Sequence, residues 1–175
     1  DNGVLHILDA ANGDVVVAGQ FTSAGGNASG HIARIVSSCA PQVTSLGAGC
    51  AGSGGLNVLT VTAAAMLGSS FRAKGTGMPA FAFVAAVTGL SSTSVPLSLA
   101  LPQALPGCTL YVTPDVVDVL LPSAGVVNTA LAVPNNATLL GAQVNHQYVP
   151  LEVDLSLNIT EVTASNGVQV TVGTF

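Results

Sequence analysis

Residues 168–172 read Val-Gln-Val-Thr-Val. The three valines share one side of an extended chain, and the Gln and Thr share the other. Such strict alternation is typical of a β-strand with one buried and one polar face. Residues 80–85, Ala-Phe-Ala-Phe-Val-Ala, set large residues against alanines. This pattern predicts a central strand packed on both sides, or a strand whose alanine face meets a partner.

Short β-prone segments, separated by Gly, Pro, Ser and Thr, recur along the chain, and none has a sustained helical period. Regularly spaced short strands are typical of all-β sandwiches and barrels. We therefore expect an all-β protein, a jelly-roll-like β-sandwich of roughly eight to ten strands. After residue 55, the predicted strands are Leu56–Thr62, Ser70–Lys74, Ala80–Thr88, Leu97–Leu101, Thr109–Thr113, Val116–Leu121, Gly125–Val133, Thr138–Leu140, Gln143–Leu151, Glu161–Ala164 and Val168–Val172.

The N-terminal region has its own strand pattern, with segments at Val4–Leu8, Asp14–Phe21 and His31–Val36. The turns Ala11–Asp14 and Gly25–Asn27 contain the Asn and Gly residues that tight hairpins require.

Three regions follow from these patterns. We expect a β-hairpin arm over residues 1–37, a Gly/Ser/Cys-rich linker over 38–55 and a β-sandwich over 56–175. Within the linker, Gln42–Leu46 is a short candidate strand.

The chain is poor in charge. Charged residues are 6% of it, against about 25% in ordinary domains. Arg34, Arg72 and Lys74 are its only basic residues besides histidine, which argues against a nucleic-acid partner.

A membrane-spanning helix needs about 20 consecutive apolar residues. The longest apolar run, Met78–Val87, is shorter and contains a proline, so no such span is expected.

The sequence begins at Asp1 rather than Met, so we expect a removed leader, a longer upstream region or a fragment. The near-absence of Lys and the abundance of Ser, Thr, Asn and Gly suit a secreted bacterial protein located outside the cell or on its surface.

Cys39, Cys50 and Cys108 are compatible with an oxidising compartment. An odd number permits at most one intrachain bridge and leaves a thiol or an interchain bond; three buried free thiols are the alternative.

Residues 8–35, LDAANGDVVVAGQFTSAGGNASGHIARI, resemble a short β-propeller repeat of large secreted bacterial proteins. The resemblance covers residues 5–36 and depends on the motif GxFTxAGG, which begins at Gly19, followed by Ile32-Ala33-Arg34. The chain holds one such unit, and one repeat cannot bury its face alone.

About residues 46–175 resemble a C-terminal domain of secreted planctomycete-type bacterial proteins. The marks are GAGCAG at 47–52, Leu67-Gly68, LPGCTL at 105–110 and TASNGV at 163–168. The resemblance implies a secreted β-sandwich without an established catalytic role. It favours a Cys50–Cys108 disulfide, with Cys39–Cys50 as the alternative.

No nucleophile elbow, HExxH, paired CxxC or phosphate-binding loop is present in the sequence. We therefore expect no enzyme, no cofactor and no metal. Two clusters of oxygen-bearing side chains could attract a cation. Asp9, Asn12 and Asp14 are better explained by a tight turn. Glu152 and Asp154, with Asp115 or Asp118, are better explained by a solvated strand face.

Residues 145–148, Asn-His-Gln-Tyr, carry groups that glycan-binding modules use, but the chain has no Trp and few aromatic residues. A structural His146 is the simpler interpretation. Three sequons in predicted turns make Asn27, Asn136 and Asn158 candidate glycosylation sites.

Soluble β-proteins guard their strand edges with Lys, other charges and Pro. This chain has one Lys, and its arm is a ribbon that is marginal alone. We hypothesise that the arm adds strands to other copies, forming an extracellular filament or surface polymer. An anchoring, sorting or glycan-binding module is the alternative. The predicted assembly residues of the arm are Val4, Leu5, Ile7, Val15, Val16, Val17 and Phe21.

Overall fold

The computed structural model describes residues 3–9, 14–24, 26–35 and 39–174. Strands make up 57% of the described residues and helices 4%, so the predicted all-β, sandwich-like fold is confirmed. The chain forms two compact units. One is an arm (Asp1–Ala40 with Thr174–Phe175), and the other is a β-sandwich (Pro41–Gly173).

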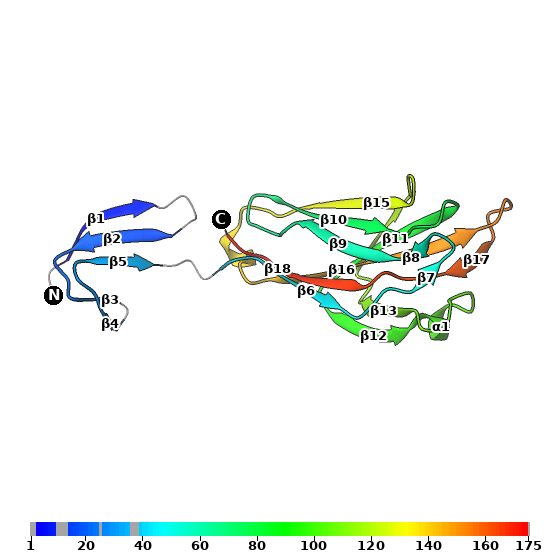
Figure 1. Cartoon of the computed structure of the whole chain (residues 1–175), viewed down its shortest axis with the longest axis horizontal. Coiled ribbons are helices and arrows are strands. Elements are labelled where there is room, and N and C mark those ends of the chain that lie inside the picture. Colours follow the sequence, from blue (N-terminus) through cyan, green and yellow to red (C-terminus); the bar gives the residue numbers. More distant parts are fainter. Residues whose placement is uncertain (1–2, 10–13, 25, 36–38, 175) are drawn as a thin grey trace. The chain divides into compact units, whose positions relative to one another are not determined.

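The arm is built on a three-stranded antiparallel sheet in the order β1-β2-β5 (Figure 1). These strands are β1 (Val4–Asp9), β2 (Val15–Gly19) and β5 (Ile32–Ile35). The short strands β3 (Ser23–Ala24) and β4 (Asn27–Ala28) pair with each other, and Gly26 between them has a φ of 80°. The predicted turn at residues 11–13 lies outside the described residues.

Residues of the repeat-like motif stabilise the arm locally. Phe21 is buried, and a Cβ at Gly19 would lie 2.6 Å from the carbonyl oxygen of Gly3, so that position has no room for a side chain. The guanidinium of Arg34 donates to the carboxylate of Asp14, which is buried. A buried carboxylate needs such a partner.

The sandwich centres on a large antiparallel sheet in the order β14-β11-β16-β18-β6, with β17 paired to β16. Its strands are β6 (Gln42–Leu46), β11 (Ala82–Gly89), β14 (Val116–Leu120), β16 (Gln143–Val153), β17 (Ile159–Val162) and β18 (Gly167–Thr171). Val168 and Val170 are buried and Gln169 is half-buried, as the alternation predicts.

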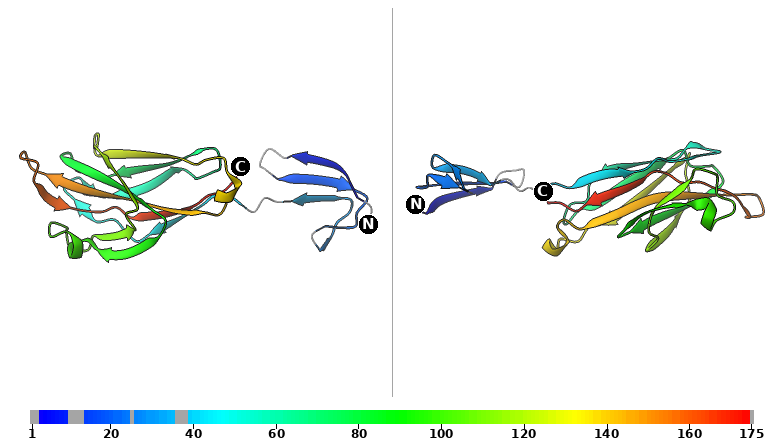
Figure 2. Two further views of the ribbon diagram at one scale, coloured as in Figure 1. Left: turned by 180° about the vertical axis from the view of Figure 1, so that it is seen from behind. Right: turned by 90° about the horizontal axis from the view of Figure 1, so that it is seen from below.

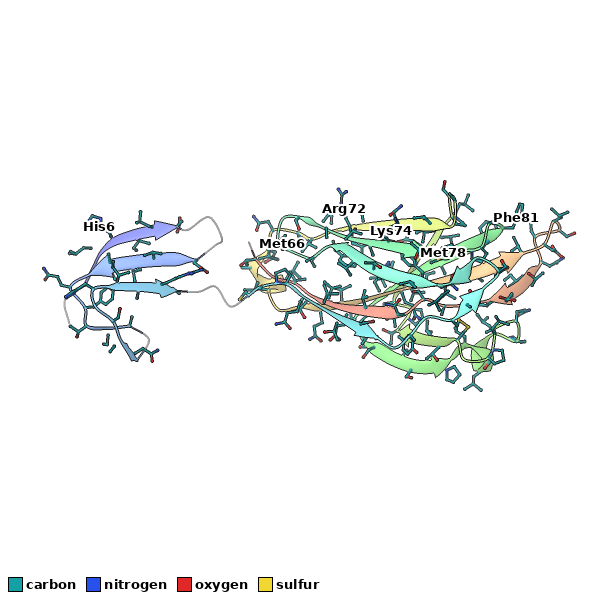
Figure 3. The ribbon with its side chains drawn as sticks, in the orientation of Figure 1. His6, Met66, Arg72, Lys74, Met78 and Phe81 are labelled. Atoms are coloured by element: carbon teal, nitrogen blue, oxygen red, sulfur yellow. A yellow bond between two sulfur atoms is a disulfide. The ribbon has the colours of Figure 1, made fainter. Side chains whose placement is uncertain are left out.

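A second sheet, in the order β15-β10-β9, covers one face of this central sheet (Figure 1). Its strands are β9 (Val58–Ala63), β10 (Ser70–Thr76) and β15 (Val126–Ala132). Phe71 and Val127 of this sheet belong to the same buried cluster as Val84, Tyr148 and Val170 of the central sheet. The outward side chains of β10 include Arg72 and Lys74 (Figure 3).

A third layer covers the other face of the central sheet. It contains β12 (Ser92–Pro96), the single helical turn α1 (Leu97–Ala100) and β13 (Thr109–Val112), and Figure 2 shows it from two further sides. Leu97 and Val112 pack in one cluster with Val87 and Val149 of the central sheet. Strand β11 is therefore packed on both sides at residues 84–87. The packing predicted for residues 80–85 is only partly present, because Phe81 and Phe83 are 74% and 37% exposed.

Two predicted strands are wrong. Residues 97–101 contain α1, because Leu97 turns into the core while Leu99 stays 79% exposed, and Leu101 donates its amide to the Leu97 carbonyl. Residues 138–140 overlap a 3-10 turn, η1 (Ala137–Leu139), because the Asn136 side chain accepts from the Thr138 amide and caps that turn.

The predicted linker over 38–55 is also corrected, since the sandwich begins at Pro41. Strand β6 pairs with β18, and β7 (Ala51–Gly52) pairs with β8 (Gly55–Leu56). A Cβ at Gly49 would lie 1.9 Å from the carbonyl oxygen of Asn57. Glycine here permits close backbone approach rather than a flexible connection.

The disulfide favoured by the family resemblance is present. Cys50 and Cys108 are joined with their Cα atoms 5.4 Å apart, across a sequence separation of 58. Cys108 lies in the core beneath α1, while Cys39 is a free thiol. The bond ties the segment before β9 to the third layer.

Removing this bond should destabilise the sandwich. Closing a loop of this length lowers the entropy of the unfolded chain, so replacing Cys50 and Cys108 by Ser should cost about 4 kcal/mol. Urea unfolding of the sandwich measures the loss. The matched control, Cys39→Ser, should leave the unfolding midpoint unchanged. Equal midpoints for all three proteins would show that the bridge contributes nothing.

Candidate functional site

The predicted assembly residues of the arm divide by burial. Val4, Leu5 and Ile7 on β1 are 50%, 66% and 66% exposed. Val15 and Val16 on β2 are half-buried. The remaining two, Val17 and Phe21, are buried in the arm and cannot contact another chain. The prediction is therefore wrong for these two residues, because their side chains fill the arm's own interior.

Sequence reasoning missed three further exposed side chains, Leu8 on β1 and Ile32 and Ile35 on β5. β1 and β5 are the outer strands of the arm's sheet in the part of the chain that the structure describes. The sequence does contain a signal for this exposure. A strand that is covered on one face alternates apolar and polar residues, whereas β1 has apolar residues at both odd and even positions.

The sandwich has a similar edge at β14, the outermost strand of the central sheet. Val116, Val117 and Val119 are 56%, 49% and 67% exposed, and Asp118 is the strand's single ionisable residue. The opposite edge, β6, is more polar, and Val43 is its one exposed large apolar residue. Exposed apolar edge strands invite pairing with another chain.

The four residues 145–148 of β16 are fully buried. Gln147 accepts from the Tyr111 amide (2.8 Å) and donates to the carbonyls of Thr109 (2.9 Å) and Ser165 (2.8 Å). Its side chain thereby joins the central sheet to the third layer. This polar patch is part of the folded core and offers no surface to a sugar.

The His146 side chain lies on the opposite face of the central sheet, in the core shared with the second sheet. Its Nδ1 lies 2.9 Å from the Thr88 hydroxyl, and its ring makes edge contacts with Phe71 and Tyr148 at centroid distances of 5.9 and 5.0 Å. Its Nε2 has no hydrogen-bond partner among the described residues. Burial lowers the pKa of His146 from 6.5 to about 4. The ring is therefore neutral at physiological pH and structural, as the simpler interpretation predicts.

Two asparagines tie the sheets together. Asn166 accepts from the Leu59 amide at 2.8 Å and donates to the Leu59 carbonyl at 3.2 Å, like a paired strand residue. Asn57 donates to the Cys50 carbonyl (3.0 Å) and to the Thr163 hydroxyl (2.9 Å). Asn166 belongs to the TASNGV stretch of the family resemblance, and its role is to position β9 against the central sheet.

The candidate carboxylates hold loops in place. Glu152 accepts from the amide and hydroxyl of Ser53, and Asp154 accepts from the amides of Ser156 and Asn158. Asp115 accepts from the Leu90 amide. Within the described ranges, no three His, Cys, Asp or Glu residues are grouped to hold a metal ion. Of the N-terminal cluster, Asp14 pairs with Arg34, and Asn12 lies outside the described residues.

An apolar cavity of about 280 Å³ opens between the two sheets of the sandwich. Phe71, Leu131, Val144 and Val170 are among its lining residues, and Gln143 is its one polar residue. No ionisable side chain lines it, so the cavity offers no group for acid–base or nucleophilic chemistry.

All three sequon asparagines, Asn27, Asn136 and Asn158, are exposed. The Asn136 side chain caps η1, and the Asn158 amide donates to the Asp154 carboxylate at 3.0 Å. Glycosylation at these sites stays a prediction.

Comparison with family models, curated proteins and solved structures finds no match to this chain. No helix of the described residues is long and apolar enough to cross a membrane. The two family resemblances therefore stay predictions.

The burial of His146 gives the sandwich a pH-dependent stability. Its pKa is about 4 in the folded state and close to 6.5 when unfolded, so the unfolded chain binds the proton first. Stability should fall as pH drops from about 6.5 to about 4, by about 3 kcal/mol from this group. Thermal unfolding of wild type and His146→Gln across this range measures it, with exposed His6→Gln as control. Identical pH slopes for wild type and His146→Gln would contradict the assignment.

Proposed function

We propose that this protein is a secreted structural subunit that self-assembles by β-strand complementation into an extracellular filament or surface polymer. The observation that supports this most is the outer strand of the arm. Every residue of β1 is exposed, and four of the six are large and apolar: Val4, Leu5, Ile7 and Leu8.

Such a strand gains stability from a partner. Fully burying a large aliphatic side chain contributes about 1.5–3 kcal/mol, so covering several of them is a substantial driving force. A small sheet with an uncovered apolar face gains stability when a further strand or sheet packs on it. The backbone of an added strand also satisfies the unpaired N–H and C=O groups of an edge.

The scarcity of charge supports the same proposal. Neither β1 nor β14 contains a Lys or Arg, and two of the chain's three, Arg72 and Lys74, lie on β10. Their charged residues are Asp9 and Asp118 alone. Lys is the residue that protects edge strands best, so strands without it pair more readily with other chains. A contact between two different surfaces of identical subunits can repeat from one copy to the next. It forms a ring if the rotation between neighbouring subunits closes the assembly, and a fibre if it does not.

A cell-surface anchoring, sorting or glycan-binding module remains the alternative from the sequence. Its sugar-contacting candidates Asn145, Gln147 and Tyr148 are buried, which leaves that proposal with less support.

Light scattering coupled to size-exclusion chromatography, with negative-stain electron microscopy, tests self-assembly of the full chain. We expect wild type to form particles larger than a monomer as concentration rises. Ile7→Lys should abolish this, because it places a charge on the apolar edge strand. Thr44→Lys, a matched change on the polar edge β6, should assemble as wild type does. A wild type that stays monomeric at every concentration would refute the proposal.

A further inference from the structure

We propose that β1 of one copy pairs in parallel with β14 of a second copy, with His6 opposite Asp118. This inference rests on the proposed function and deepens it, because it names the two strands and their register. His6 lies on the outer strand of the arm (Figure 3), and Asp118 lies on β14, the outer strand of the central sheet.

β14 is the edge of the sandwich best suited to receive β1. Its residues 116–119 are exposed on both faces, whereas the outer strands of the second sheet, β9 and β15, mix buried and polar positions. Pro114 and Pro122 flank it, and proline interrupts a backbone ladder. The available edge is therefore a short window of about the length of β1.

The two strands match residue by residue. Residues 4–8 read Val-Leu-His-Ile-Leu, and residues 116–120 read Val-Val-Asp-Val-Leu. Each has two apolar residues on either side of one central polar residue. The central residues, His6 and Asp118, are both exposed, and a carboxylate accepts a hydrogen bond from either form of imidazole. Apolar and opposite-charge cross-strand pairs both stabilise a sheet.

The flanking residues select the direction. In an antiparallel ladder with His6 opposite Asp118, Asp9 lies opposite Asp115, and opposed like charges are destabilising. In the parallel ladder Asp9 lies opposite Leu121 instead. The parallel ladder thus keeps the central pair and removes the repulsion.

Pairing of β14 with β14 of another copy fits less well. In the antiparallel register that matches the whole strand, Asp118 lies opposite its own copy, and opposed like charges are destabilising.

The contact would join two sheets into one. The arm's β5-β2-β1 would continue directly into β14-β11-β16-β18-β6 of the next copy. Every copy offers one β1 and one β14, so the same contact can repeat in one direction.

Thiol cross-linking reads the register directly. Neighbouring strands lie about 4.8 Å apart, within the Cα range of a disulfide. Ile7 and Val119 are exposed, opposed in the parallel ladder, and beyond the bulge between Val4 and His6. In a Cys39→Ser background, chains carrying Ile7→Cys are mixed with chains carrying Val119→Cys under mild oxidation. The control mixture replaces Val119→Cys with Val117→Cys, the antiparallel partner of residue 7.

We expect about tenfold more covalent heterodimer from the 7/119 mixture than from the 7/117 mixture, because opposed thiols have a high effective concentration. Charge substitution tests the central pair independently. His6→Asp should raise the concentration needed for assembly about tenfold or more by opposing two carboxylates. Adding Asp118→Lys to that variant should restore assembly. Circular dichroism and thermal unfolding check that each variant is folded.

The outcomes separate this inference from the proposed function. A wild type that never assembles refutes both. Assembly with equal cross-linking in the two mixtures, or with more at 7/117, refutes the parallel pairing alone. So does a 7/119 bond that forms only when both cysteines are in one chain. Failure of Asp118→Lys to rescue His6→Asp refutes the central pair.

Discussion

Burial of both faces of the central sheet constrains the rest of the molecule. Strands β11 and β16 lie between two apolar clusters, one shared with the second sheet and one with the third layer. A charge there would lose its hydration without a partner, so these strands carry very few ionisable groups. The polar side chains that are buried act as backbone partners. Gln147 and Asn166 each bond to main-chain N–H and C=O groups that the ladders leave open.

The same scarcity of charge extends to the sheet margins, where it has a different consequence. A strand buried on both sides gains from having no Lys, whereas an outer strand without Lys is open to pairing. β1 and β14 are such strands. All of β1 and residues 116–119 of β14 are exposed on both faces. The stability of the core and the proposed self-association would then share one compositional cause.

Much of the strand pattern could be predicted from the sequence, because alternation is local. Gln143–Leu151 was expected and β16 spans Gln143–Val153. Two strand predictions were wrong for local reasons. Residues 97–101 alternate like a strand but contain the helical turn α1, and the Asn136 side chain caps the 3-10 turn η1 where a strand was expected. The third layer and the order of strands depend on long-range packing, which periodicity does not encode. For that reason the sequence showed β14 as a strand but not as an edge, and did not separate the buried Phe21 from the exposed Ile7.

Amide hydrogen exchange of Val116–Leu120, compared between dilute and concentrated protein, tests most directly whether the unguarded edge of the central sheet is filled by another copy. Peptides covering β6, at the other edge, serve as the internal reference. We expect the amides of β14 to exchange more slowly as concentration rises, while those of β6 do not change. Exchange from β14 that is equally fast at all concentrations would contradict the idea that this edge is where the copies join.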